Sequence, residues 1–117
     1  MLTPIQKAYG YIVRYQNGKP QVLVFEHPVK EAGIQIPKGT VEVGETPRKA
    51  VIREMMEETG LVNLEVEELL ADDLWRNDGG LLHHRFFYRI KSTEQQDQWF
   101  HAPSGGGKED GLIFRLF

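Results

Sequence analysis

The chain has 117 residues, which is enough for one domain with one hydrophobic core and too few for two. Its 17 acidic and 14 basic residues leave a formal net charge of -3, which argues against a general nucleic-acid or membrane-surface binder because no basic field would hold a polyanion. With no cysteine, disulfides and thiolate metal sites are excluded as well. We see no secretory signal and no apolar run long enough to span a bilayer, so we expect a cytoplasmic protein without a membrane segment.

The first third of the chain predicts strands. Residues 7–15 ("KAYGYIVRY") alternate as a strand does, residues 16–20 ("QNGKP") have turn chemistry, and residues 21–27 ("QVLVFEH") predict a second strand. Residues 33–39 ("GIQIPKG") predict a short extended segment that ends at Pro37 and Gly39.

One helix is predicted next, over residues 47–59. Thr46 is a good N-cap, Pro47 suits the first helical position, and Gly60 suits the left-handed position after the last turn.

The second half of the chain predicts further strands. Residues 64–75 ("LEVEELLADDLW") predict a strand with acidic decoration, although their leucines and glutamates leave a helix open, and residues 81–90 ("LLHHRFFYRI") predict another strand. Residues 101–111 predict a loop, and residues 112–117 ("LIFRLF") the beginning of a last strand. The pattern is therefore that of a single α/β domain over residues 1–117, with a mixed sheet and one helix.

The predicted helix gathers acidic side chains on one side. Glu54, Glu57 and Glu58 lie opposite the apolar side formed by Val51, Ile52, Met55 and Met56, and the two methionines are expected in the core. For most helices this would be a solvated face. Here two of the glutamates fall in the last turn, where the helix dipole disfavours negative charge.

The surrounding residues also argue against a merely solvated face. Arg53 can pair with Glu57 four residues later or reach back to Glu45 in the preceding loop. Carboxylates held together against repulsion need a strong counter-charge, and an oxygen-only ligand set fits a hard cation, Mg²⁺ or Mn²⁺. Because Mg²⁺ sites usually combine a few carboxylates with substrate phosphates, the helix predicts a phosphoanhydride substrate.

Residues 39–61 read G-x5-E-x7-R-E-M-x-E-E-x-G-L, and this run resembles, without one departure, the signature box of the Nudix hydrolases. The resemblance implies an α/β/α sandwich in which the box forms a loop, a helix and a loop on a mixed sheet. It also implies Mg²⁺-dependent hydrolysis of a nucleoside diphosphate linked to another moiety. Family members commonly finish with a further helix, and because the chain ends inside a strand-like run we expect that helix to be absent.

The resemblance further implies roles for single residues. The metal ligands would be Glu54, Glu57, Glu58 and the backbone carbonyl of Lys38. Arg53 matches the arginine that orients a glutamate. The supporting residues would be Glu45, together with Gly39 and Gly60 at positions where the backbone must turn.

Outside the box, Glu109 stands on the loop before the last strand, where some family members carry an additional base or metal ligand. A solvated loop residue is the alternative for Glu109. We favour Glu54 as the residue that activates water, and Glu109 as an auxiliary. The glycine run before Glu109 is not a Walker A loop because no G-K-[ST] follows.

Two further groups have a functional and a structural interpretation. His83, Arg85 and Arg89 share one face of a predicted strand and could meet phosphates, but the solvated side of a half-buried strand is favoured. Aromatic rings could stack on a base, although packing in the core or at a sheet edge is favoured for each of Trp75, Trp99 and Phe100.

The sequence thus predicts a pyrophosphohydrolase that acts on a small-molecule nucleotide. The substrate subgroup is left open, because "PKG" resembles the entry of the diadenosine-polyphosphate hydrolases while "RNDGG" stands where their tyrosine would be. The alternative from another class is a nucleotide sensor that kept the fold and lost turnover, although the intact box favours the enzyme. A homodimer is compatible with either prediction.

Overall fold

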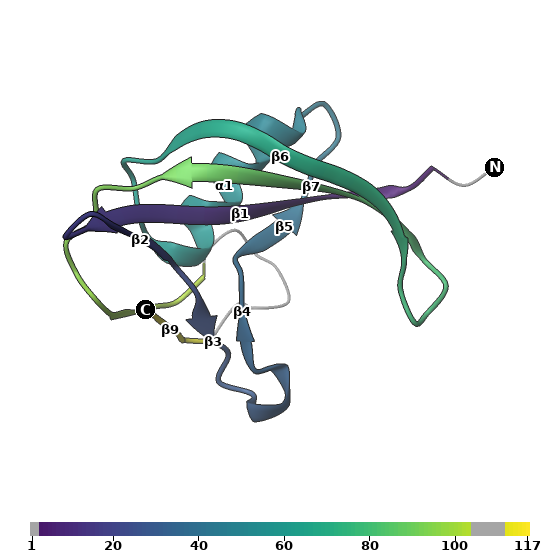
Figure 1. The fold of residues 1–117 in the computed structure, drawn as a ribbon. Coiled ribbons are helices and arrows are strands. Elements are labelled where there is room, and N and C mark those ends of the chain that lie inside the picture. Colours follow the sequence, from purple (N-terminus) through teal and green to yellow (C-terminus); the bar gives the residue numbers. More distant parts are fainter. Residues whose placement is uncertain (1–2, 104–111) are drawn as a thin grey trace.

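The computed structural model describes residues 3–103 and 112–117, and its largest sheet, sheet A, is built around β1 (Figure 1). Strand β1 (Ile5–Gln16) pairs in parallel with β7 (Leu82–Lys91). On its other edge β1 pairs antiparallel with β2 (Lys19–Val22) and β5 (Lys38–Thr40), while β6 (Glu65–Arg76) pairs antiparallel with β7. One parallel pair among antiparallel ones makes sheet A a mixed sheet, as predicted.

A smaller antiparallel sheet, sheet B, lies beside sheet A (Figure 1). Its strands follow the order β4 (Ile34–Gln35), β3 (Phe25–Glu26), β9 (Phe114–Leu116) and β8 (Trp99–His101). A short 3-10 helix, η1 (Lys30–Ala32), connects β3 with β4.

Helix α1 (Pro47–Thr59) begins and ends as its capping residues predict. The Thr46 hydroxyl accepts a hydrogen bond from the Lys49 amide at 3.2 Å, and Pro47 occupies the first turn. Gly60 adopts a left-handed φ of 80° and its N–H donates to the Met56 carbonyl at 2.9 Å. The helix bounds are therefore set by local chemistry.

The core lies between α1 and one face of sheet A. Alternate residues of β1 and β7, among them Ala8, Ile12 and Ile90, pack with Val51 and Met55 of α1. A second buried cluster in sheet B consists of Phe25, Phe114 and Leu116. Leu23 and Trp99 contact both clusters, and they thereby join the two sheets into one structure.

Most of the predicted elements are confirmed, and the alternative left open for residues 64–75 is resolved as strand β6. The single strand predicted over residues 21–27 is wrong. The Leu23 amide donates to Ile12 in sheet A and the Val24 amide donates to Phe117, so the chain crosses between the sheets at this point. Strand β8 was not predicted.

On α1, the burial of two residues differs from the prediction. Met56 is 40% exposed, whereas Glu58 is only 5% exposed. The reason for the second difference is a backbone partner on β5, described below.

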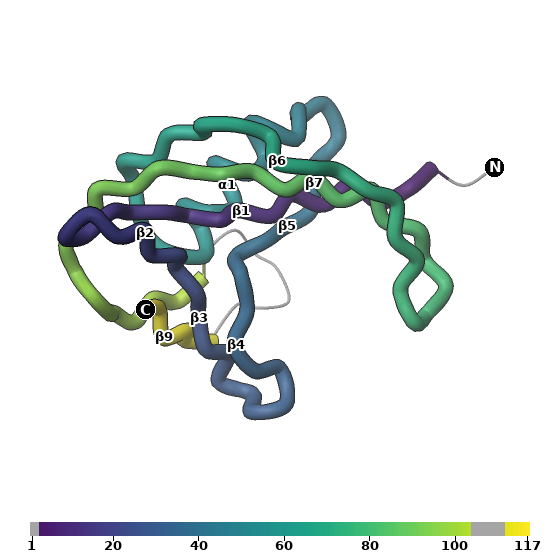
Figure 2. The backbone as a smooth tube through the Cα atoms, in the orientation of Figure 1, coloured from purple at the N-terminus to yellow at the C-terminus, as the bar shows by residue number. Residues whose placement is uncertain are grey.

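The molecule is elongated, with principal dimensions of 49, 31 and 24 Å. Figure 2 shows the cause: the hairpin of β6 and β7 extends past the part of sheet A that α1 covers. The described residues contain one α-helix, on one face of sheet A, and none of their helices is long and apolar enough to cross a membrane.

Candidate active site

Arg53 is the centre of the acidic site. Its Nε donates to Oε2 of Glu45 at 2.8 Å and its Nη2 donates to Oε1 of Glu45 at 2.9 Å, which is the two-pronged geometry that suits a guanidinium and a carboxylate. The pairing from helix back to loop that the sequence predicted is therefore present.

The remaining donors of Arg53 reach three other groups. Nη1 donates to Glu54 Oε1 at 2.8 Å and to Glu57 Oε2 at 3.3 Å, while Nη2 also donates to the Thr40 carbonyl at 3.0 Å. A guanidinium has five N–H donors, and all of them are engaged here. Arg53 thus ties the loop before α1, two glutamates of α1 and the end of β5 into one rigid unit.

The carboxylates of this unit have pKa values that are shifted in opposite directions. The Arg53 hydrogen bonds lower the pKa of Glu45 from 4.5 to about 2. Burial raises the pKa of Glu54, with a further contribution from the negative charge of Glu57, and the bond from Arg53 opposes both. A cation beside Glu54 would relieve the same desolvation and repulsion.

Glu58 lies on the side of α1 that faces β5. The Lys38 amide donates to Glu58 Oε2 at 2.8 Å, so this buried carboxylate is held by the backbone of the strand that enters the box. The sequence placed Glu58 and Lys38 in one site, and the structure brings them into contact.

The two box glycines serve different purposes. Gly60 has a φ of 80° and marks a backbone turn, as expected. Gly39 lies inside β5, so the expectation of a turn is wrong there. A Cβ at Gly39 would lie 1.9 Å from Glu54 Cδ, which means that the absence of a side chain leaves the space that the Glu54 carboxylate occupies.

The donor set fits a hard divalent cation. It consists of carboxylate oxygens from consecutive turns of one helix beside the Lys38 backbone, and it contains neither sulfur nor imidazole. Arg53 occupies one oxygen of Glu54 and one of Glu57, and each carboxylate has a second oxygen. Within residues 3–103 and 112–117, no three His, Asp or Glu side chains already converge as a finished metal site. Glu109 lies outside the described residues.

The face of sheet A turned away from α1, here called the outer face, combines aromatic and basic side chains. Tyr9 and Phe87 stack with their ring centres 4.8 Å apart. The Arg85 guanidinium lies 4.7 Å from the Trp75 ring centre, and Lys38 Nζ lies 5.6 Å from that of Tyr9. This arrangement comes from four neighbouring strands, so it could not be derived from any one of them.

The three basic side chains singled out on β7 have different surroundings. Arg85 makes a two-pronged bond to Asp73 at 2.8 and 2.6 Å, and Arg89 pairs with Glu68 at 3.1 Å. Burial lowers the pKa of His83, as do the positive charges of Lys7, Arg85 and Lys38. Arg89 fits the solvated-side interpretation, whereas Arg85 lies among the rings of the outer face.

The three aromatic residues singled out in the sequence also have different surroundings. Trp75 lies on the edge strand β6, where it is 40% exposed beneath Arg85 and packs edge-on against His83, so edge packing holds for it. Phe100 is 71% exposed, so packing is wrong for Phe100. Trp99 packs against both core clusters, as favoured. Trp99 and His101 also donate hydrogen bonds to the end of α1. The sequence did not predict these bonds, because residues 101–103 were expected to belong to a loop.

Comparison with known proteins gives a consistent result. The NUDIX domain family model matches residues 4–105. RNA pyrophosphohydrolase from Roseobacter denitrificans is 44% identical over 61 residues, which are 51% of this chain and 38% of that protein. RNA pyrophosphohydrolase from Actinobacillus succinogenes is 46% identical over 41 residues, which are 35% of this chain and 21% of that protein. The matched segments thus span well under half of either relative.

Solved structures share the fold. The C. elegans Ap4A hydrolase superposes with a TM-score of 0.68 at 23% identity, covering 81% of this chain and 73% of that one. A UDP-X diphosphatase superposes with a TM-score of 0.69 at 21% identity, covering 100% of this chain and 51% of that one.

Proposed function

Because this chain belongs to the NUDIX domain family, we propose that it is a Mg²⁺-dependent pyrophosphohydrolase that cleaves a phosphoanhydride bond in a nucleoside diphosphate linked to another moiety. The observation that carries the proposal is the Arg53 unit. Its five hydrogen bonds aim the carboxylates of Glu54 and Glu57 from one helix while Glu45 supplies the balancing charge. A merely solvated acidic face has no need for such fixed geometry.

The residues that would hold the metal ion are Glu54, Glu57, Glu58 and the Lys38 carbonyl. When bound, a divalent cation neutralises phosphate charge and acidifies a coordinated water. Glu54 would take the proton from that water. Its rigid position against Gly39 and its link to Arg53 suit this role, and an ionised carboxylate beside an acidified water needs no raised pKa. Glu109 is proposed as an auxiliary.

We propose that the nucleoside part of the substrate binds on the outer face. Tyr9, Phe87 and Trp75 offer ring surfaces, and Lys38 and Arg85 offer positive charge on a chain whose net charge is negative. Strand β5 has Glu54 packed against Gly39 and Lys38 beside Tyr9, so it separates the acidic site from the outer face by the width of one strand. A nucleotide could therefore span both. We also propose that the protein is cytoplasmic.

The test is a substrate panel with Mg²⁺, comprising nucleoside triphosphates, dinucleoside polyphosphates, ADP-ribose, nucleotide sugars and 5′-triphosphorylated RNA. We expect turnover of at least one class, lowered by ~10²-fold or more in Glu57→Gln with an unchanged circular dichroism spectrum. The matched control is Glu65→Gln, which removes an exposed glutamate of β6. Tight binding of one compound without turnover would instead support a nucleotide sensor.

A further inference from the structure

Two side chains of β8 bind the end of α1. Trp99 Nε1 donates to the Thr59 carbonyl at 2.8 Å, and His101 Nε2 lies 2.9 Å from the Glu57 carbonyl. Since a carbonyl oxygen can only accept, the proton of this bond is on His101 Nε2. Trp99 and His101 are two residues apart, so both point to the same side of the strand, and Phe100 between them is 71% exposed.

These bonds reach the part of α1 that would otherwise be least stable. The last carbonyls of a helix have no partner within it. Here Gly60 binds the Met56 carbonyl, while β8 supplies donors for those of Glu57 and Thr59. The last turn contains no basic residue, and its acidic side chains oppose the helix dipole. Fraying of this turn is therefore favoured unless donors from outside oppose it.

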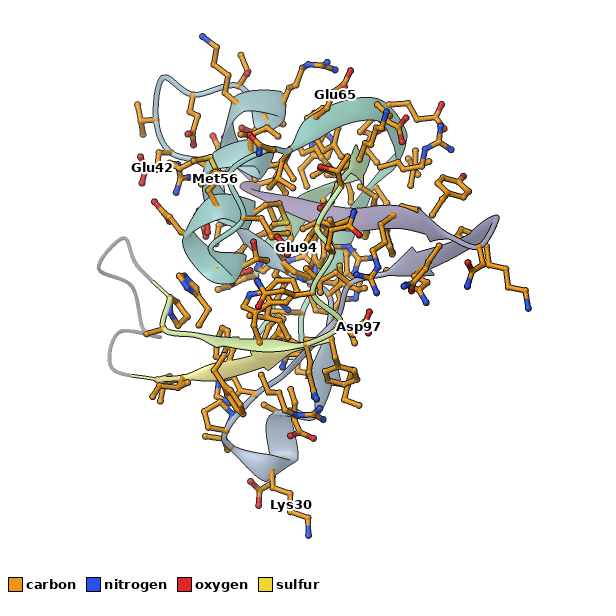
Figure 3. The ribbon with its side chains drawn as sticks, turned by 90° about the vertical axis from the view of Figure 1, so that its left-hand side faces the viewer. Lys30, Glu42, Met56, Glu65, Glu94 and Asp97 are labelled. Carbon is orange, nitrogen blue, oxygen red and sulfur yellow. The ribbon has the colours of Figure 1, made fainter. Side chains whose placement is uncertain are left out.

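Gly60 makes the approach of β8 feasible. A Cβ at Gly60 would lie 2.8 Å from His101 Nδ1, so the imidazole ring lies directly on the glycine backbone. The same residue has the left-handed φ of 80° that ends the helix. In Figure 3 β8 and β9 lie next to one another below α1, and β9 contributes Phe114 and Leu116 to the core of sheet B. Sheet B thus supports the end of the helix.

We propose that Trp99 and His101 are positioning residues of the acidic site. By holding the carbonyls of the last turn, they keep the turn that carries Glu57 and Glu58 wound, so that Glu57 stays in reach of Arg53 and Glu58 in reach of the Lys38 amide. This inference rests on the proposed function, because it assigns to the two residues an effect on metal affinity. They act through the backbone of α1, which is the part of the site that they contact.

The experiment uses Mn²⁺ alone, without substrate, as a spectroscopic probe of the site. Binding is measured by electron paramagnetic resonance, and hydrogen exchange reports the amides of residues 57–61. We expect His101→Leu to weaken Mn²⁺ binding by ~10-fold or more, as loss of an outer support commonly does, and to speed the exchange. His101→Gln keeps a side-chain N–H donor and should recover most of both effects. Phe100→Ala on the same strand should behave like the parent.

Trp99→Phe provides a second variant that keeps an aromatic ring and removes only the Nε1 donor. It should weaken Mn²⁺ binding in the same direction, and it applies even if His101→Leu does not fold. Faster exchange with parental Mn²⁺ affinity in these variants would show a structural role alone and overturn the inference. Failure of the parent to bind Mn²⁺ would instead overturn the proposed function, and the inference with it.

Discussion

Arg53 acts through its shape as much as through its charge. Five hydrogen bonds in one plane connect it with two loop oxygens, two helix carboxylates and a strand carbonyl. A lysine ammonium has three donors at a single point and can satisfy only part of this set.

We therefore expect Arg53→Lys to lose ~10²-fold or more in kcat at saturating Mg²⁺ and substrate, because Glu54 and Glu57 would no longer be held in one orientation. Circular dichroism should show an unchanged fold. Equal activity of Arg53→Lys and the parent would show that only the positive charge is needed.

Glu45 makes the stability of the fold depend on pH. Its pKa is about 2 in the folded protein, below the ordinary 4.5, so its stabilising contribution is complete above about pH 4.5 and is lost as the pH falls through 2. Glu45→Gln should be less stable than the parent at pH 7, and the difference should shrink between pH 4.5 and 2. Urea denaturation midpoints at several pH values measure this, with Glu65→Gln as the control. A difference that stays constant with pH would refute the assignment.

At the scale of elements, α1 lies directly against β1 and β5. Met55 fills the space at Gly10, where a Cβ would lie 2.3 Å from its sulfur, and Glu54 fills the space at Gly39. The helix can lie this close to sheet A only because two strands lack a side chain at the contact.

Gly39→Ala tests this contact at the site. A new Cβ would overlap the Glu54 carboxylate, so we expect Glu54 to be displaced and kcat to fall by ~10-fold or more while the chain still folds. Gly79→Ala is the matched control, since its Cβ would meet only Asn77 at 3.4 Å in the exposed β6–β7 turn. Parental kinetics in Gly39→Ala would mean that the position of Glu54 is unimportant.

The sequence predicted the elements whose bounds are set by residues close to them in the chain. The bounds of α1 follow from Thr46, Pro47 and Gly60, and the turn before β2 from Asn17 and Gly18, which both adopt positive φ. The break after Val22 depends on the bonds between Val24 and Phe117, which are distant in sequence. Strand β8 is equally non-local, because β9 and the end of α1 are its partners.

The same distinction applies to the site. Helix geometry predicted the pairing of Arg53 with Glu57 four residues later, and the alternative of reaching back to Glu45 in the preceding loop is present as well. The burial of Glu58 and the outer face both depend on the register of β5 against β1, which one segment alone does not contain.

At the scale of the whole molecule, the segment between β7 and β8 is one of the connections between the two sheets. Figure 3 shows the segment between β7 and β8, marked by Glu94 and Asp97, leading from sheet A to sheet B. Arg14 of β1 holds this segment by donating to the carbonyls of Glu94 and Gln96 at 3.0 and 2.8 Å. A metal ion that binds only the folded chain would stabilise both sheets together.

Mg²⁺ should raise the melting temperature of the parent protein. A ligand that binds only the folded state at 100 times its Kd adds about 2.7 kcal/mol. A domain of this size gains about 4 °C for each kcal/mol. Thermal denaturation with MgCl₂ is compared with KCl of equal ionic strength. Glu57→Gln and Glu58→Gln should lose most of the shift, and an undiminished shift in both would contradict their assignment as ligands.

The parallel pairing of β1 with β7 has a consequence for biosynthesis. Ile5 pairs with His83 and Val13 with Lys91. The central contact of sheet A therefore joins a strand near the start of the chain with a strand in its last third. Closing so long a loop costs entropy before any contact is gained, which slows folding. A nascent chain that ends before β7 already contains all of α1, yet it lacks the Tyr88 and Ile90 that cover the helix. We therefore expect the acidic site to assemble late during translation, with part of the apolar side of its helix uncovered until β7 has been made.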